Sequence, residues 1–407
     1  MSSMKAKPRL AVVSPFLDKR HGSERITIEW LSHLPNEFDV HIYSQRVEDF
    51  DESKFTWHRI PELPGPHLLN FLWWLAANRL WRYWDERFRG LRHDVVFSAG
   101  ANCLDADAIC VHIVFAEYTR QVRAKMRFLR NPIWEWPRLL HRKLYYSISV
   151  WMEDQAYRNC ETKLVVYSRK TARELEQFFG RADRIPVLHL GLDHSVFNTA
   201  VREALRGRAR DALKLAKEQF TLILVGNDWR NKGVPVLLDA LAKLRDLRVG
   251  LLIVSREDQS SCWRLVTEKK LEDRVFFLPP RKDIEFYYAA ADAYTGPSLQ
   301  DSYGIPPAEA MACGLPVIVS AAAGVSEIVT NDVDGIVLDD PTDAAKLATM
   351  IRRLYEDKEF RNRLGNKASE TARRYTWERN GRDLAEIFEE MLRRKGRPGI
   401  QTLSQES

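Results

Sequence analysis

The stretch Gly296–Ser320, which reads GPSLQDSYGIPPAEAMACGLPVIVS, constrains the fold of this 407-residue chain more than any other. Gly304 permits a positive φ and the two prolines after it fix φ for a helix start, so a short helix is predicted over Ala308–Cys313. Gly314 suits the C-cap of that helix, and Val317–Val319 indicates a fully buried strand. A helix N-terminus behind a glycine turn directs backbone N–H groups at one point, which suits a phosphate.

Two carboxylates, Asp301 and Glu309, flank this glycine turn eight positions apart. The turn between them would fold both side chains toward the same ligand. A carboxylate beside a phosphate-binding helix N-terminus suits the vicinal hydroxyls of a ribose. The first hypothesis for this stretch is therefore a nucleotide-sugar site.

The composition is that of a globular protein in a reducing compartment. Hydrophobic residues make up 45% of the chain and charged residues 29%, and 407 residues exceed one ordinary core, so two domains are expected. The net charge of +6 is compatible with an anionic surface or substrate, but no nucleic-acid partner is expected. The five cysteines lack CxxC spacing, which favours a reduced, cytoplasmic protein without a structural zinc site. No apolar run reaches the roughly 20 residues that span a bilayer, so any membrane contact is expected to be peripheral.

A strand, a glycine-containing loop and an amphipathic helix open the chain, and the pattern returns in its second half. The first strand is expected at Arg9–Pro15, its loop contains Gly22, and its helix covers about Glu24–Leu34. The pattern restarts with a strand at Phe220–Val225 and the loop Gly226–Gly233. This order is typical of doubly wound α/β domains, in which ligands bind beyond the carboxyl ends of the strands. We therefore expect two successive βαβ domains with a cleft between them.

Further elements complete the two domains. Strands are expected at Val40–Ser44, Val95–Ala99, Ala108–Val114, Lys163–Ser168, Val249–Ser255 and Arg274–Leu278. Helices are expected at Thr171–Phe179, Val234–Leu244, Cys262–Lys270, Asp283–Ala290, Asp343–Tyr355, Glu359–Tyr375 and Trp377–Arg394. Between the domains, Arg184–Phe197 is interpreted as a last strand feeding a linker, and Arg202–Gln219 as a charged lead into the second domain.

The loop Gly226–Gly233, GNDWRNKG, is a second candidate phosphate site. It is not a Walker A sequence, because the Gly-x4-Gly-Lys-Ser/Thr order is absent. It nevertheless places Arg230 and Lys232 at the carboxyl edge of the sheet, near a helix N-terminus. Fixed cations there would neutralise a diphosphate leaving group in place of a metal ion. A solvated turn is the alternative interpretation of this loop.

Two regions of the first half, Phe71–Trp84 and Thr119–Tyr146, combine aromatic with basic residues. The second contains eight Lys or Arg residues and a single acid, Glu135. Peripheral binding to an anionic membrane uses this combination, with rings at the headgroup level and cations against the lipid. The alternative is a set of ordinary domain helices with Trp faces in the core and Arg faces in water. Both interpretations stay open, and RNA binding lacks a recognition motif.

With both loops in view, the chain resembles the retaining glycosyltransferases of family 4 over nearly its whole length. The most specific part is DSYGIPPAEAMACGLPVI, which is similar to the family's E-x7-E block followed by AMACG-x-PV. The resemblance implies the GT-B fold, an α/β architecture of two Rossmann-like doubly wound domains that face a central cleft. It implies an acceptor-side domain over residues 1–190, a donor-side domain over 191–376, and a C-terminal helix and tail over 377–407 that return to the first domain.

The resemblance also implies roles for residues of the two loops. Glu309 corresponds to the glutamate that binds the donor ribose, and Asp301 to the acid that approaches the donor sugar. Gly304 and Ile305 stand where main-chain amides meet the sugar and the phosphates. Lys232 matches the lysine that holds the diphosphate.

Other positions match the family or depart from it. Gly22 matches the glycine of the first-domain loop that faces the reaction centre, and His112 stands where the family often carries a histidine near the donor sugar. The family's arginine after the first glycine of the lysine loop is replaced by Asn227, and Arg230 could supply the guanidinium instead. Asp301 is one methylene shorter than the usual glutamate, which would shift its hydrogen bond to the sugar or select a different donor.

The resemblance implies transfer of a hexose from a nucleotide diphosphate sugar, such as a UDP- or GDP-sugar, to an acceptor hydroxyl with retention of configuration. We expect no metal site and no cofactor, a glycan or lipid-linked acceptor of the cell envelope, and a cytoplasmic protein at the inner membrane face. Two other classes stay open. One is a GT-B-fold nucleotide-sugar epimerase, and the other is a non-catalytic sugar-nucleotide-binding subunit, which the departures at Asp301 and Asn227 would fit.

Overall fold

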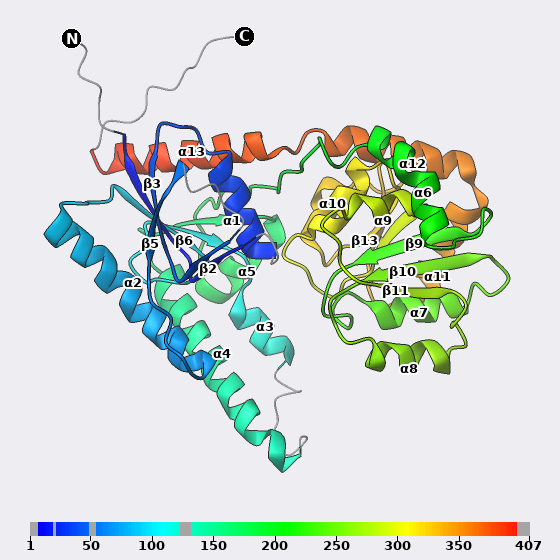
Figure 1. Cartoon of the computed structure of the whole chain (residues 1–407), viewed down its shortest axis with the longest axis horizontal. Coiled ribbons are helices and arrows are strands. Elements are labelled where there is room, and N and C mark those ends of the chain that lie inside the picture. Colours follow the sequence, from blue (N-terminus) through cyan, green and yellow to red (C-terminus); the bar gives the residue numbers. More distant parts are fainter. Residues whose placement is uncertain (1–6, 19–21, 49–53, 123–131, 397–407) are drawn as a thin grey trace, which may run out of the picture. The chain divides into compact units, whose positions relative to one another are not determined.

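The computed structural model describes residues 7–18, 22–48, 54–122 and 132–396, and it divides into two compact units (Figure 1). Unit 1 comprises Met1–Leu188 together with Trp377–Ser407, and unit 2 comprises His189–Thr376. The last helix, α13 (Trp377–Arg394), is therefore part of the first unit.

Unit 1 is built on a six-stranded sheet in the order β5-β3-β1-β6-β7-β8, in which neighbouring strands are parallel. The strands are β1 (Arg9–Val13), β3 (Asp39–Ser44), β5 (Thr56–Arg59), β6 (Val95–Ala99), β7 (Ala108–Val111) and β8 (Lys163–Val166), with a separate short pair of β2 (Phe16–Leu17) and β4 (Arg46–Val47). The helices are α1 (Gly22–Ser32), α2 (His67–Arg89), α3 (Phe115–Val122), α4 (Trp136–Tyr157), α5 (Arg169–Phe179) and α13, with a 3-10 turn η3 (Ile133–Glu135) before α4.

The strands of this sheet are apolar on both faces because helices cover both faces. Ala11 of β1 belongs to a buried cluster with Trp74 of α2 and Tyr157 of α4. Phe97 of β6 pairs with the alternate position of β1 and so faces the other way, where its ring lies 5.4 Å from that of Phe388 in α13. The C-terminal helix thus completes the second face of the sheet in unit 1.

Unit 2 repeats this architecture with the strand order β11-β10-β9-β12-β13-β14, again parallel. The strands are β9 (Phe220–Val225), β10 (Val249–Val254), β11 (Val275–Leu278), β12 (Ala293–Gly296), β13 (Val317–Ser320) and β14 (Ile336–Leu338). The helices are α6 (Thr199–Ala212), α7 (Val234–Ala242), α8 (Ser260–Glu268), α9 (Glu285–Ala290), α10 (Ile305–Ala312), α11 (Ala344–Glu356) and α12 (Lys358–Ala372), with a 3-10 turn η4 (Gly324–Ile328).

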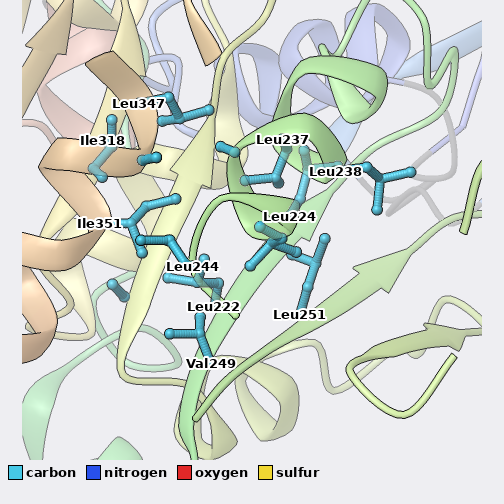
Figure 2. Close-up of a cluster of buried hydrophobic side chains, with 14 of the residues drawn as sticks. Leu222, Leu224, Leu237, Leu238, Leu244, Val249, Leu251, Ile318, Leu347 and Ile351 are labelled. Carbon is cyan, nitrogen blue, oxygen red and sulfur yellow. The ribbon is translucent and has the colours of Figure 1, made fainter. Parts of the chain in front are cut away.

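A buried core of unit 2 lies between its sheet and the helices α7 and α11 (Figure 2). Leu222 and Leu224 of β9 and Leu237 of α7 belong to this cluster, together with Leu347 and Ile351 of α11. All five side chains are fully buried. Burying an aliphatic side chain of this size contributes roughly 1.5–3 kcal/mol relative to leaving it exposed, so this cluster is a main source of the stability of unit 2.

Two predictions for the region between the domains were wrong. Arg184–Phe197 contains no strand and contributes two isolated bridges, from Val187 to Val166 and from Leu192 to Thr376. The interpretation of Arg202–Gln219 as a charged lead fails because much of it is helix α6, whose arginines are used inside unit 2. Arg206 and Arg210 donate to carbonyls at the end of α9, such as the 3.0 Å bond from Arg210 to Ala290. These guanidinium groups satisfy carbonyls that a helix C-terminus leaves without partners.

Other expected elements agree closely with the structure. The strands at Val95–Ala99 and Phe220–Val225 and the helix Trp377–Arg394 have the predicted bounds. The edge strand β5 was missed, because its sequence TWHR is half exposed and carries no apolar run. Part of the predicted basic-aromatic region Thr119–Tyr146 lies outside the described residues, which resume at 132.

Two helical glycines give a matched test of this packing. An alanine Cβ at Gly381 of α13 would lie 2.0 Å from the carbonyl oxygen of His33, whereas a Cβ at Gly207 of α6 meets nothing within 4 Å. We expect Gly381→Ala to lower the free energy of unfolding by about 1–3 kcal/mol through overpacking. Gly207→Ala should raise it by about 0.5–1 kcal/mol because alanine suits a helix better. Urea unfolding followed by tryptophan fluorescence measures both, and equal effects of the two variants would contradict the packing described.

Candidate active site

The order of the strands in unit 2 brings two loops together. The chain moves outward from β9 through β10 to β11, and then returns to the other side of β9 with β12. The loops after β9 and β12 therefore leave the same edge of the sheet at neighbouring points, which is where open α/β sheets bind ligands. Backbone and side chain join them: the amide of Leu299 donates to the Asn231 carbonyl at 2.7 Å, and Asn231 Nδ2 donates to the Gln300 carbonyl at 2.8 Å.

One glycine makes this close approach of the two loops sterically feasible, and a second makes room for the side chain of Lys232. At Gly233, with φ of +76°, a Cβ would lie 2.0 Å from the carbonyl oxygen of Pro297 in the other loop. At Gly226, with φ of +150°, a Cβ would lie 2.9 Å from Cε of Lys232. The side chain of Lys232 therefore runs over Gly226. Gly226 and Gly233 together determine the position of its ammonium group.

That ammonium group meets the predicted sugar-binding acid. Nζ of Lys232 lies 2.5 Å from Oδ2 of Asp301, and their side chains are 20% and 19% exposed. Asp301 also accepts a long hydrogen bond, 3.4 Å, from the amide of Tyr303. The two loops thus place one cation and one carboxylate in contact, with part of each open to a ligand.

The helix after the second loop begins earlier than predicted. We expected a start at Ala308, but α10 begins at Ile305, directly after Gly304 with its φ of +92°. Pro306 and Pro307 occupy its second and third positions, where their missing N–H groups do not disturb the helix. Because these prolines donate nothing, the backbone donors at this end of the helix are the amides of Gly304 and Ile305.

Glu309 lies one turn into α10 and is only 3% exposed. Its Oε2 accepts a hydrogen bond of 2.9 Å from the hydroxyl of Tyr288 in α9. Burial, followed by the charge of Glu309, raises the pKa of Tyr288 well above its ordinary value, so the hydroxyl remains a donor. Sequence reasoning did not find Tyr288, because its role depends on how α9 packs against α10.

The other two predicted residues of the β9 loop lie apart from the Lys232–Asp301 pair. Asn227 Oδ1 accepts hydrogen bonds from the Arg256 amide at 3.0 Å and from Ser255 Oγ at 3.2 Å, so it joins this loop to the one after β10. Glu257, which sequence reasoning missed, adds to this junction by accepting from the Asp228 amide at 2.7 Å. Arg230 is exposed at the loop surface.

Unit 1 has a cavity of about 330 Å³ at the corresponding point of its own sheet, between β1 and β6. The predicted residue His112, just after β7, lines it. Polar and aromatic side chains of the loops and of α1, α2 and α4 form the rest of the wall, including Glu24, Asn70, Trp74, Asn102, Tyr145 and Glu153. Gly22 begins α1, and a Cβ there would meet no atom within 4 Å, so the folded chain itself does not require a glycine.

Two titratable side chains of this cavity are held by neighbouring elements. The Tyr167 hydroxyl is hydrogen-bonded to Nδ1 of His112, and burial lowers the pKa of His112 to about 4, which keeps its ring neutral at pH 7. Glu153, which sequence reasoning missed, accepts from the amides of Phe115 and Ala116 at 2.7 and 3.0 Å. Burial raises the pKa of Glu153 to about 8, against the opposing effect of these amides. Glu153 belongs to α4 and reaches the first amides of α3 only through tertiary packing. The sequence gives no signal of this contact.

Comparison with known proteins identifies the family. The model described as Glycosyltransferase Family 4 matches residues 20–196, and the model described as Glycosyl transferases group 1 matches residues 206–371. The chain belongs to these glycosyltransferases. The predicted family is thereby confirmed.

Curated relatives carry the name D-inositol 3-phosphate glycosyltransferase. The protein from Thermomonospora curvata is 31% identical over 262 residues, which is 60% of this chain and 60% of the relative. The protein from Xylanimonas cellulosilytica is 29% identical over 246 residues, 57% of this chain and 58% of the relative. The match thus spans little more than half of each curated relative.

Solved structures show the fold. WaaG, a glycosyltransferase involved in lipopolysaccharide biosynthesis, has a TM-score of 0.74 at 20% identity, with 93% of this chain and 99% of that chain covered. Anabaena HepE in complex with UDP-glucose has a TM-score of 0.71 at 19% identity, covering 93% and 99%. At this identity the likeness concerns the fold alone, which is GT-B, as predicted.

The partly buried imidazole of His112 predicts a pH dependence of stability. Its pKa of about 4 in the folded protein lies below the ordinary 6.5, so on acidification the unfolded chain takes up this proton first. The stabilising contribution is complete above pH 6.5 and is lost as the pH falls toward 4, by at most about 3 kcal/mol. Urea unfolding between pH 7 and pH 4.5 should show a smaller loss for His112→Gln than for the wild-type protein. Parallel curves for the two proteins would contradict the burial of a neutral ring.

Proposed function

We propose that this protein is a retaining glycosyltransferase that moves a sugar from a nucleotide diphosphate sugar to an acceptor hydroxyl. One observation carries the proposal: in a chain of this family, the loops after β9 and β12 bring Lys232 into contact with Asp301 just before the helix that bears Glu309. A cation, a carboxylate and a helix N-terminus then lie within one short stretch of structure. These three groups suit a diphosphate that links a ribose to a sugar, since the cation and the helix N-terminus bind phosphate and the carboxylates accept from hydroxyls.

The donor would be bound by exchange of partners at this pair. Lys232 would release Asp301 and hold the diphosphate, with the amides of Gly304 and Ile305 as further donors. Glu309 would accept hydrogen bonds from the ribose hydroxyls. Asp301, once released, would accept hydrogen bonds from hydroxyls of the donor sugar. HepE, a neighbour in fold, is known in complex with UDP-glucose and with UDP, which makes a UDP-sugar the first donor to test.

The reaction would break the bond between the anomeric carbon and the diphosphate oxygen and form a bond from that carbon to the acceptor oxygen on the same face. The acceptor proton would pass to the departing diphosphate. Fixed positive charge from Lys232, and from Arg230 if that loop closes on the ligand, would stabilise the leaving group, so we propose that neither a metal ion nor a cofactor is required. His112 and Gly22 are proposed as donor-binding residues, and Asn227 as a support of the lysine loop.

The acceptor is proposed to be a hydroxyl of a cell-envelope glycan or of a lipid-linked precursor. The names of relatives support polyol or glycan acceptors in this family, since they include D-inositol 3-phosphate glycosyltransferase and a glycosyltransferase of lipopolysaccharide biosynthesis. The protein would act in the cytoplasm, because all five cysteines are free thiols, as expected in a reducing compartment.

Substitution of the donor-binding residues tests the proposal. Lys232→Ala and Glu309→Gln should each lower kcat/KM for sugar transfer by at least about a hundredfold, because they remove charge or hydrogen bonds from the diphosphate and the ribose. Asp301→Asn should lose turnover, because the carboxylate that accepts from the donor sugar is gone. The variant should keep its affinity for UDP, because Lys232 is no longer held by a carboxylate. Transfer from a panel of UDP- and GDP-sugars, together with calorimetry of UDP binding, measures these effects.

The matched control is Lys346→Ala, which breaks an exposed ion pair with Asp339 of 2.8 Å elsewhere in unit 2. This variant should transfer sugar at the wild-type rate. Wild-type rates in Lys232→Ala would contradict the proposal. Release of an epimerised free donor without acceptor would indicate an epimerase instead, and donor binding with neither transfer nor hydrolysis would indicate a non-catalytic subunit.

A further inference from the structure

Helix α2 leaves a line of large apolar side chains uncovered. Leu69, Leu72, Leu80, Tyr83 and Trp84 recur at the spacing of one helical face, and all are exposed. Trp84 is 56% exposed. An apolar stripe of this kind normally packs into the core, yet the core-facing side of α2 is a different set of residues that includes Trp74 and Ala77. The helix is therefore apolar on two faces, and one of them has no cover within the described chain.

The turn η3 and helix α4 repeat this feature. Their exposed apolar residues are Ile133, Trp134, Trp136, Leu140, Leu144 and Trp151. Trp134 is 77% exposed, which is unusual for the largest apolar side chain. The inward side of α4 carries Met152 and Tyr157, which are buried. The expectation that the Trp faces of these helices lie in the core holds for Trp74 but fails for Trp84 and Trp134.

Positive charge accompanies both apolar faces. Along α2 and just after it, Arg79, Arg87, Arg89 and Arg92 are exposed. Three of them are paired with acids: Arg79 lies 3.9 Å from Asp105, Arg89 3.0 Å from Asp85 and Arg92 3.7 Å from Glu86. Arg138 and Arg142 are exposed in the first turns of α4 and follow Glu135 of η3, whereas Asp154 lies near the end of the helix, paired with Arg158 at 2.5 Å. Exposed aromatic and aliphatic residues that are interspersed with arginine fit an anionic phospholipid surface, where rings sit among the headgroups and guanidinium groups meet phosphate.

A groove beside the last turns of α2 offers space for part of a lipid. It has a volume of about 730 Å³ and is lined by Trp57 of β5 and by Leu80, Trp81, Trp84 and Phe88 of α2. Arg59, Arg89 and Asp85 also line this groove, and Arg89 lies 3.0 Å from Asp85. Apolar walls with cations beside them suit an acyl chain whose phosphate stays at the surface.

The inner faces of the same two helices wall the cavity of unit 1. Asn70, Phe71 and Trp74 of α2 line it together with Tyr145 and Glu153 of α4. The helices touch there, because the rings of Phe71 and Tyr145 lie 5.2 Å apart. A molecule held at the outer faces would thus lie one helix thickness from the cavity.

We propose that the outer faces of α2 and η3–α4 dock on an anionic phospholipid bilayer and that the cavity behind them receives an acceptor presented from that surface. The acceptor part of this inference rests on the proposed glycosyl transfer, whereas the docking surface stands on the exposed residues alone. Among the described residues no helix is long and apolar enough to cross a bilayer, so the contact is made by helices that lie in the interface.

Vesicle co-sedimentation of the full chain tests the docking surface. The wild-type protein should pellet with phosphatidylglycerol-containing vesicles at low salt, and less with pure phosphatidylcholine or at high salt. The double variants Trp84→Gln/Phe88→Gln and Arg138→Glu/Arg142→Glu should each bind at least about tenfold more weakly. A matched pair in unit 2, Trp263→Gln/Arg264→Glu, alters an exposed tryptophan and its neighbouring arginine and should bind as the wild type does.

Donor binding to the same preparations, measured as thermal stabilisation by UDP, separates this proposal from the proposed function. Equal UDP responses in all variants show that unit 2 still binds the donor, and equal unfolding temperatures without UDP show that unit 1 is folded, as expected for substitutions of exposed side chains. Wild-type protein that stays in the supernatant, or α2 and α4 variants that pellet like the wild type, would overturn the docking surface while leaving glycosyl transfer untouched. A dimer in light scattering that both variants abolish, without vesicle binding, would assign these faces to a second copy and would likewise overturn it.

Discussion

The contact between the loops after β9 and β12 is the interaction on which the rest of unit 2 depends. It exists because the strand order reverses between these two strands, and it is close because Gly233 has no side chain facing the Pro297 carbonyl. Any larger residue would push the loops apart and move Lys232 away from Asp301. The site is thus fixed by backbone geometry first and by charge second. An ion pair that is one fifth exposed would not by itself hold two loops in register.

The residues that sequence reasoning found are those whose roles follow from local chain geometry. Gly304, the prolines after it and Glu309 lie within six positions of one another, so their relation could be predicted from the order of residues alone. The error at Ala308 has the same origin, because prolines are compatible with the first turn of a helix and so do not mark where it begins. Most strands of both sheets were equally accessible, since they are buried apolar runs, but β5, β12, β14 and helix α6 were not predicted.

Roles that depend on tertiary packing could not be predicted from the sequence. Tyr288 reaches Glu309 from another helix, and Glu153 caps α3 from a position thirty-eight residues along the chain. The segment that forms α6 was interpreted as a charged lead into the second domain, because the carbonyl acceptors of its arginines cannot be seen in the sequence. Basic and aromatic residues of α2 and α4 could be noticed but not assigned, because the same letters suit a core or a surface. Only burial, which separates Trp74 from Trp84, decides between them.

The central claim is that a nucleotide diphosphate takes the place of Asp301 on Lys232. The most direct measurement is a crystal structure of the protein with UDP or an unreactive UDP-sugar bound. We expect diphosphate oxygens within hydrogen-bond distance of Lys232 Nζ and of the Gly304 and Ile305 amides, with the ribose on Glu309. A nucleotide bound elsewhere, with the 2.5 Å Lys232–Asp301 contact still intact, would contradict the account.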